Sequence, residues 1–237
     1  MQLFYNPNIS ENSIDIVFDK DESRHITKVL RMREGDTLKI TNGTGSFFDA
    51  EISVVTPKQC IAKILKEEKV KPLPYHLHLA VAPTKLNDRY EWFLEKATEI
   101  GVSEITPIIC DHSERKVIKP ERYQKIIQSA LKQSLKAHLP VLNEAVSLKN
   151  FIESTSSNDG ICCIAHCEEN DKNSLKSVLK PNTKITILIG PEGDFSPEEI
   201  ELALKSGFIP VSLGNTRLRT ETAAVVACHS VAFINHE

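Results

Sequence analysis

The chain contains 237 residues, of which 26% are charged and 41% hydrophobic, and its formal net charge is −3. This length favours two domains over one, and the composition is ordinary for a folded globular protein. No apolar run reaches the roughly 18 residues that a membrane-spanning helix needs, and residues 1–7 lack the basic start of a signal peptide. We therefore expect a cytoplasmic protein without a membrane segment.

The 6 cysteines do not follow the spacing of a disulfide framework or of a metal site. The densest group, residues 162–167 (Cys-Cys-Ile-Ala-His-Cys), lacks the C-x2-C spacing of zinc ligands. No second Cys/His pair lies at zinc-finger distance from it, and neighbouring residues of a strand point to opposite faces. We expect reduced thiols and no bound metal.

Residues 1–70 predict a small strand-rich domain. Polar and apolar side chains alternate at 13–18, 36–41 and 48–54, and a hairpin turn is expected at 42–45 (Asn-Gly-Thr-Gly). A helix is expected at 21–33, where its cations form either a solvated face or the RNA-contacting edge of a β-barrel. These cations are Arg24, Lys28, Arg31 and Arg33. The charged, proline-rich stretch 66–74 indicates the domain boundary.

From residue 75 onward, predicted strands and helices alternate, which indicates an α/β domain with a mainly parallel sheet. We place this second domain at residues 74–237. The expected strands are 75–82, 104–110, 161–166, 184–189 and 209–213. The expected helices are 87–101, 120–138, 147–153, 173–179, 196–206 and 220–235.

Positive charge is concentrated in residues 115–140, which hold 7 Lys or Arg and 1 Glu in an otherwise acidic chain. In the expected helix 120–138, apolar side chains fall on one side and cations on the other. This pattern is typical either of a solvated helix face or of a surface that binds a polyanion. The cations of the segment are Arg115, Lys116, Lys119, Arg122, Lys125, Lys132 and Lys136.

The motifs of P-loop, dinucleotide-binding and serine-nucleophile sites are absent from the sequence. Two glycine-containing loops instead follow predicted strands, at the edge where open α/β sheets bind ligands. They are 189–199 (Ile-Gly-Pro-Glu-Gly-Asp-Phe-Ser-Pro-Glu-Glu) and 213–223 (Leu-Gly-Asn-Thr-Arg-Leu-Arg-Thr-Glu-Thr-Ala). Taken alone, the first loop could be only a tight strand-to-helix turn. The second loop places two arginines beside a helix start, which suits an anion or a polarised oxygen.

The two loops, and the order in which they follow each other along the chain, closely resemble those of the RsmE family of ribosomal small subunit rRNA methyltransferases. The resemblance continues at 95–102, 133–140 and 25–36 and so covers nearly the whole chain. It implies a SPOUT-superfamily α/β domain with a C-terminal trefoil knot, preceded by a PUA-like RNA-binding β-barrel. It further implies S-adenosylmethionine-dependent methylation of a uridine N3 in 16S ribosomal RNA, and a homodimer.

The resemblance also gives an expectation for the site residues. We expect Arg219, possibly with Arg217, to stabilise charge on the target uracil, and Glu221 to orient an arginine or to help the N3 proton leave. The expected cofactor-binding residues are Leu188, Ile189, Gly190, Glu192, Gly193, Leu213, Gly214, Leu218, Thr220 and Ala223. The expected RNA-binding residues are Arg24, Lys28, Arg31, Arg33, Arg115, Lys116, Arg122, Lys125, Lys132 and Lys136.

Three positions depart from the family pattern. Asp194 stands where a second glycine is usual, and it either alters the cofactor fit or tolerates its backbone conformation without effect. Lys136 replaces a usual arginine, and His138 replaces another basic residue, so we expect reduced RNA affinity. Two alternatives stay open: a sister SPOUT RNA methyltransferase with another target, and a non-catalytic RNA-binding or ribosome-assembly protein.

Overall fold

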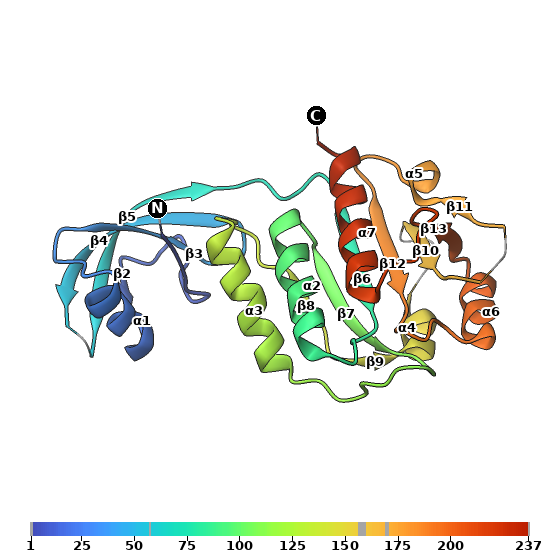
Figure 1. The fold of residues 1–237 in the computed structure, drawn as a ribbon. Coiled ribbons are helices and arrows are strands. Elements are labelled where there is room, and N and C mark those ends of the chain that lie inside the picture. Colours follow the sequence, from blue (N-terminus) through green and yellow to red (C-terminus); the bar gives the residue numbers. More distant parts are fainter. Residues whose placement is uncertain (1, 57, 156–159, 169–170, 237) are drawn as a thin grey trace. The chain divides into compact units, whose positions relative to one another are not determined.

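The computed structural model describes residues 2–56, 58–155, 160–168 and 171–236. The chain divides into two compact units (Figure 1). Unit 1 comprises Met1–Pro72 and Leu131–Leu139, and unit 2 comprises Leu73–Ala130 and Pro140–Glu237. The segment 131–139 therefore groups with the N-terminal residues, although it lies far along the chain.

Unit 1 is built on a five-stranded sheet in the order β1-β3-β4-β5-β2. β1 runs parallel to β3, and the other neighbours are antiparallel. Alternate strand residues point inward, so that Phe4, Ile40 and Phe48 form a buried core with Ile26. The elements are β1 (Leu3–Tyr5), β2 (Asp15–Val17), α1 (Lys20–Arg24), the π-helical segment η1 (His25–Val29), β3 (Thr37–Thr41), β4 (Ser46–Val55) and β5 (Cys60–Lys69).

The sequence predicts β2, β3 and β4 but misses β1 and β5. In β5 the charged run 63–69 hides the apolar alternation, and in β1 the strand is only three residues long. The helix expected at 21–33 is wrong beyond residue 30. Arg31 has a φ of 57°, and the Met32 N–H donates to the Ile26 carbonyl at 3.1 Å, so the chain turns there. Arg31 and Arg33 consequently follow the helix.

The hairpin loop between β3 and β4 is held by the segment 131–139. Thr44 forms a bridge with His138, and the Gly45 N–H donates to the Ala137 carbonyl at 2.9 Å. His138 Nε2 donates to the Val70 carbonyl at 3.0 Å, and a Cβ on Gly45 would lie only 2.6 Å from the His138 ring. Gly45 has a φ of 106°, which suits glycine. His138 therefore has a structural role within unit 1.

Unit 2 contains an eight-stranded parallel sheet in the order β11-β13-β10-β12-β6-β7-β8, with β9 also paired to β7. This confirms the predicted α/β class with a parallel sheet. Its strands are β6 (His76–Val81), β7 (Glu104–Ile109), β8 (Val141–Leu142), β9 (Val146–Ser147), β10 (Ile161–Ala165), β11 (Asn173–Ser174), β12 (Lys184–Ile189) and β13 (Ile209–Ser212). The helices that follow β6 along the chain are α2 (Asn87–Ile100), α3 (Pro120–Gln133), α4 (Leu148–Ser154), α5 (Leu175–Val178), α6 (Pro197–Lys205) and α7 (Thr220–Ile234).

Helices cover both faces of this sheet. α4 and α6 pack on one face, against a core that includes Ala80, Ile164 and Leu188. α2 and α7 lie side by side over the other face (Figure 1). Because successive strand residues point to opposite faces, Leu79 and Ile187 lie under the α2/α7 pair. Both faces are apolar, as is usual for a parallel sheet between two helical layers.

Two predicted helices of the second half are too long. The helix expected at 120–138 ends at Gln133, because Leu135 adopts a φ of 54° and the Lys136 N–H donates to the Leu131 carbonyl at 3.2 Å. This geometry closes the last helical turn, and Lys136 lies beyond it. The helix expected at 173–179 is divided between β11 and α5. The two-residue strands β8, β9 and β11 were not predicted.

Within the described ranges, no helix combines the length and the apolar character that crossing a bilayer requires. Those ranges also contain no group of three His, Cys, Asp or Glu side chains that could hold a metal ion. The 6 cysteines are free thiols, and only Cys167 is exposed.

Candidate active site

Three neighbouring strands of unit 2 end at one edge of the sheet. β10 pairs in parallel with both β12 and β13, so their carboxyl ends lie side by side. The described residues that follow them are 166–168 and 171–172 after β10, 190–196 after β12 and 213–219 after β13. α6 begins directly after the second loop, with a capping box between Ser196 and Glu199, and α7 begins directly after the third. The parallel pairing therefore brings three separate loops together.

Two adjoining cavities lie between these loops. The first, of about 470 Å³, has the loops after β10 and β13 as its walls. The second, of about 380 Å³, lies against the loops after β12 and β13. Ala165, Cys167, Arg217, Leu218 and Ala223 line both cavities, so the two share a wall.

Most of the residues expected to bind a cofactor line this site. The first cavity contains Leu213 and Gly214, and Leu218 and Ala223 are shared between the two. The backbone at Gly214 has a φ of 128°, and a Cβ placed there would meet nothing within 4 Å. The second cavity is also lined by Ile189, Gly190, Glu192 and Thr220.

Leu188 and Gly193 line neither cavity. The Leu188 side chain, expected to bind the cofactor, is completely buried in the core beneath α4 and α6. Gly193 lies against His112 instead: a Cβ on Gly193 would fall 3.0 Å from the His112 Cβ, and His112 Nδ1 donates to the Gly193 carbonyl at 3.0 Å. Leu188 thus belongs to the core under the sheet, and Gly193 packs against His112.

The expected catalytic residues lie at the second cavity and behind it. Arg217 and Arg219 are exposed at its surface, and Arg219 is the residue just before α7. Glu221 is buried in the first turn of α7, and its Oε1 lies 3.8 Å from Nε of Arg89. Arg89 comes from α2 and lines the second cavity. The arginine that Glu221 contacts is thus Arg89, which sequence reasoning missed because Arg89 belongs to neither glycine loop.

Unpartnered polar atoms are concentrated at this site. Among the described residues, buried side-chain N and O atoms without a hydrogen-bond partner occur only at His166 (Nδ1 and Nε2) and Glu221 (Oε2). His166 lines the first cavity and is 6% exposed. Burial lowers the pKa of His166, and Lys172 lowers it further, while Asp194 and Glu168 act in the opposite direction. Native proteins pair nearly all such atoms, so a polar ligand is expected here.

Two carboxylates of the loop after β12 accept hydrogen bonds from backbone N–H groups of other segments. Asp194, at a φ of 62°, accepts the Cys167 N–H through Oδ2 at 2.7 Å and thereby links this loop to the one after β10. Glu192 accepts the Lys85 N–H through Oε1 at 2.9 Å. Glu192 is expected to bind a cofactor, and its bond to the Lys85 N–H also gives it a structural role.

Comparison with known proteins identifies the family. The family described as RNA methyltransferase domain matches residues 71–232, and the one described as RNA methyltransferase PUA domain matches residues 18–65. Ribosomal RNA small subunit methyltransferase E of Buchnera aphidicola is 36% identical over 92% of this chain and 88% of its own.

The chain belongs to the ribosomal RNA small subunit methyltransferase E family. Solved structures agree: a probable rRNA-methyltransferase from Porphyromonas gingivalis matches with a TM-score of 0.92 and 43% identity, covering 99% of this chain and 98% of its own. The S-adenosyl methionine-bound methyltransferase E from Neisseria gonorrhoeae matches with a TM-score of 0.87 and 27% identity over 99% and 98% of the two chains. The protein is therefore an RNA methyltransferase with a PUA-like domain, as the sequence predicted.

In this methyltransferase, the cations expected to contact RNA differ in how far they are already paired. Within unit 1, Lys132 forms an ion pair with Glu22 at 2.9 Å, and Lys136 is half-buried. Among the cations expected to contact RNA, those exposed in unit 1 are Arg24, Lys28, Arg31 and Arg33. These four follow one another along α1, η1 and the turn after them, and they are more exposed than the paired Lys132.

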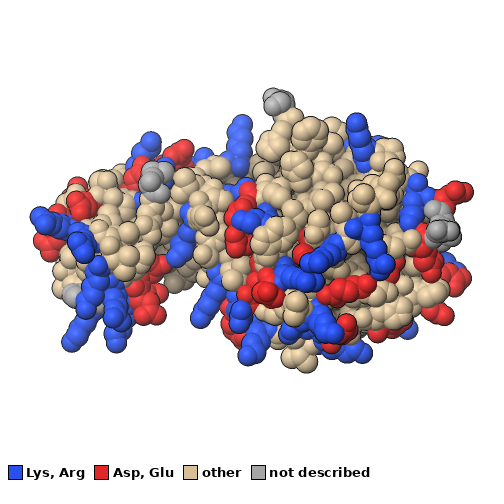
Figure 2. All heavy atoms as spheres, viewed as in Figure 1, with Lys and Arg blue, Asp and Glu red and all other residues tan. Residues whose placement is uncertain are grey.

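In unit 2 of the methyltransferase, two of the expected cations are held by the protein itself. Arg122 donates to Glu91 at 2.8 Å, and Arg115 donates to two backbone carbonyls at 3.0 and 2.8 Å. Lys116 and Lys125 are exposed, and neither has a hydrogen-bond or ion-pair partner in the part of the chain that the structure describes. Figure 2 shows cations and carboxylates interspersed on the face in view.

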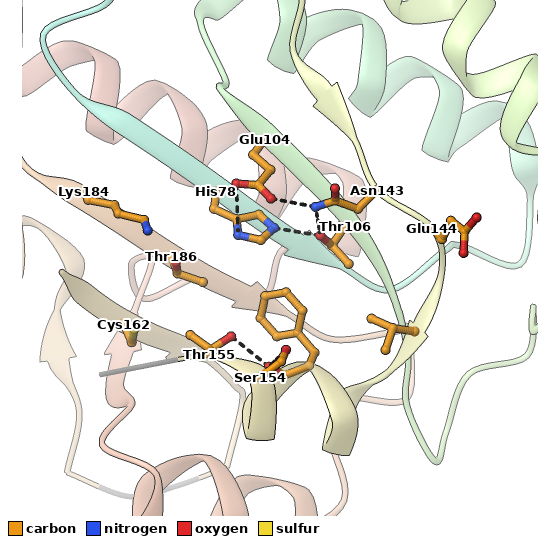
Figure 3. A pocket seen from close by; sticks show the side chains of 12 residues that line it. His78, Glu104, Thr106, Asn143, Glu144, Ser154, Thr155, Cys162, Lys184 and Thr186 are labelled. Atoms are coloured by element: carbon orange, nitrogen blue, oxygen red, sulfur yellow. Dashed lines mark hydrogen bonds and ion pairs between the residues drawn. The ribbon is translucent and has the colours of Figure 1, made fainter. Parts of the chain in front are cut away.

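A third cavity, of about 350 Å³, is lined by none of the expected site residues of this methyltransferase (Figure 3). Four of its polar side chains, those of His78, Glu104, Thr106 and Asn143, form hydrogen bonds with one another. His78 Nε2 lies 2.7 Å from the Thr106 hydroxyl, and Asn143 Nδ2 donates to Glu104 at 2.7 Å and to Thr106 at 2.8 Å. These four side chains therefore already have partners within the protein.

Proposed function

We propose that the protein transfers the methyl group of S-adenosylmethionine to N3 of a uridine in the 16S ribosomal RNA of the small subunit. The observation that carries this proposal is the meeting of three strand-end loops around two adjoining cavities, with exposed arginines among the lining residues, in a chain of this methyltransferase family. S-adenosylmethionine is the cofactor of this reaction, and its sulfonium supplies an electrophilic methyl group.

The residues of the two cavities fit this cofactor. Open backbone at Gly214 and the small side chain of Ala223 leave room for a flat ring. Leu213 and Leu218 supply apolar contact, and the unpartnered ring nitrogens of His166 supply polar contact. The resemblance also predicts a C-terminal trefoil knot in this domain, and that threading stays a prediction.

The reaction requires loss of the uracil N3 proton and stabilisation of the negative charge that remains on the flanking oxygens. Arg219 and Arg217 can supply that stabilisation from the surface of the second cavity. N3 belongs to the Watson–Crick edge, so the target base must be unpaired or flipped to reach the site. Positioning N3 in line with the methyl group accounts for a large share of the rate.

RNA binding is proposed for both parts of the chain. Residues 1–70 act as the PUA-like RNA-binding domain, with the exposed cations of α1 and η1, and residues 74–237 act as the SPOUT methyltransferase domain, with Lys116 and Lys125. Phosphate contacts of this kind give affinity and orientation without reading sequence. The enzyme is proposed to work in the cytoplasm as a homodimer.

The test is methylation of small ribosomal subunits from a strain that lacks the modification, with labelled S-adenosylmethionine. We expect label in N3-methyluridine at a single site. Arg219→Ala should lower kcat by about 10²- to 10³-fold, as loss of one oxyanion-stabilising donor does, with unchanged affinity for the cofactor. Lys205→Ala, on α6 and paired with Glu201, is the control. Label in another nucleoside, or normal turnover of the Arg219 variant, would contradict this assignment.

A further inference from the structure

His166 is buried in a way that its own protein environment does not explain. Its side chain is 6% exposed, and both ring nitrogens lack a hydrogen-bond partner among the described residues. It follows β10 directly and lines the first cavity together with Leu213 and Gly214. A neutral imidazole has one N–H donor and one acceptor nitrogen, and burying both without partners is costly.

The backbone at His166 is held from two sides. Lys172 Nζ donates to the His166 carbonyl at 2.9 Å and to the Glu168 carbonyl at 2.8 Å. On the other side, Asp194 Oδ2 accepts the N–H of Cys167, the next residue, at 2.7 Å. These bonds fix the direction in which the His166 side chain leaves the loop, so the unpartnered ring does not result from a loose segment.

Asp194 can make this bond because of its backbone conformation. Its φ of 62° lies in the left-handed region, which Asp tolerates better than most residues but which glycine adopts without strain. The carboxylate thus adds something that a glycine at this position would lack: a hydrogen-bond acceptor that ties the loop after β12 to the loop after β10. Asp194 and Cys167 both line the second cavity, so this hydrogen bond lies at the site itself.

We infer that His166 contacts S-adenosylmethionine through a hydroxyl or carboxylate oxygen of the cofactor, and that Asp194 is a positioning residue that holds His166 for this contact. The inference rests on the proposed function, since it assigns residues to the cofactor of that reaction. It adds His166, which lies in neither glycine loop, and it gives Asp194 of the first glycine loop a defined role.

The first test is calorimetric titration of the protein with S-adenosylmethionine and with its product, S-adenosylhomocysteine. His166→Ala and His166→Asn should each raise the Kd for both by about tenfold, the effect of losing one hydrogen bond. 5′-Methylthioadenosine, which keeps the ribose but lacks the amino-acid group, identifies the oxygen. An equal loss with this probe assigns a ribose hydroxyl, and no loss with it assigns the carboxylate.

The second test separates the bond of Asp194 from its backbone conformation. Asp194→Gly keeps the left-handed conformation and removes the acceptor, so we expect a several-fold higher Kd for S-adenosylmethionine at unchanged thermal stability. Asp194→Asn keeps an acceptor oxygen and tolerates the same conformation, so it should restore the wild-type Kd.

Two results would overturn the inference. One is an unchanged Kd in folded His166 variants, and the other is an equal Kd for Asp194→Gly and Asp194→Asn. In both cases the wild-type protein still binds S-adenosylmethionine, and the proposed function stands. Failure of the wild-type protein to bind the cofactor would instead count against the proposed function itself.

Discussion

Glu221 combines near-complete burial with an oxygen that has no hydrogen-bond partner among the described residues, and its nearest cation is Arg89. A buried carboxylate in such a position stabilises the fold little, because its desolvation offsets the attraction of the ion pair. It does hold the guanidinium of Arg89 at the wall of the second cavity. The pair is therefore better explained by the site than by stability.

This explanation predicts that a substitution of Glu221 lowers activity without lowering stability. Glu221→Gln should leave thermal stability unchanged or slightly raised and lower kcat/KM for RNA several-fold, since Arg89 loses its anchor. Arg89→Gln should lower stability by about 1–2 kcal/mol, less than for a fully buried pair because Arg89 stays partly exposed, and lower activity as well. Thermal melts and steady-state kinetics measure both. A parallel loss of stability and activity in the Glu221 variant would indicate a purely structural pair.

His78 gives the fold a dependence on pH. Burial lowers the pKa of His78, Glu104 counteracts this, and His76 and Lys184 lower the pKa further. Because the folded-state pKa lies below the ordinary His value of 6.5, the unfolded chain binds more protons in the interval between the two values. The stability from neutral His78 is thus fully present above pH 6.5 and declines as the pH falls below it.

We therefore expect the melting temperature to fall between pH 7 and pH 5 in the wild-type protein and to fall less in His78→Asn. His166 also has a lowered pKa and contributes in the same direction, so His166→Asn is the matched comparison. The measurement is a series of thermal melts at constant ionic strength. If the wild-type and His78→Asn proteins showed an identical pH dependence of the melting temperature, His78 would not contribute to it.

At the scale of elements, α3 shows why a charge pattern alone overstates a binding surface. Its cations fall on one side of the helix, but Arg122 is paired with Glu91 of α2, and Lys136 lies beyond the helix end. Lys125 is exposed without such a partner in the described parts of the chain. Charge that is already neutralised by the protein releases fewer counterions from RNA when it binds.

This difference predicts unequal effects within one helix. Lys125→Ala should weaken RNA binding and reduce the slope of log K against log salt by about 1, whereas Arg122→Ala should change the slope less. Binding measured between low and moderate salt gives the slopes, and Lys205→Ala on α6 is the control. Equal slope changes for Lys125 and Arg122 would mean that RNA opens the Arg122–Glu91 pair.

The same elements show what the sequence could and could not predict. Alternation and loop signals located β3, β4 and the five long strands of unit 2, because those strands have regular apolar faces. In β5 the charged run hides the apolar alternation, although the strand pairs with its hairpin neighbour β4. The two-residue strands β8, β9 and β11 pair with partners far along the chain, which no local pattern contains. The glycine loops contain Arg217 and Gly214, which line the cavities, whereas the further lining residues Arg89 and Lys172 belong to other segments and became visible only in the fold.

At the scale of the whole molecule, the exposed apolar side chains on α2 and α7 need an explanation. Trp92 on α2 is 43% exposed and Phe233 on α7 is 65% exposed. These two helices pack side by side on one face of the sheet, while α4 and α6 cover the other (Figure 1). Large aromatic side chains are enriched in protein interfaces, so this face suits the proposed homodimer.

The dimer prediction can be tested with one substitution and one matched control. Phe233→Glu places a charge where two copies of the α2/α7 face would meet, so it should shift the wild-type mass of about twice 26.5 kDa toward the monomer in light scattering after gel filtration. Leu204→Glu makes the same kind of change at a 40% exposed position on α6, over the other face of the sheet, and should leave the mass unchanged. A wild-type monomer at micromolar concentration, or equal effects of the two substitutions, would place the contact elsewhere or remove it.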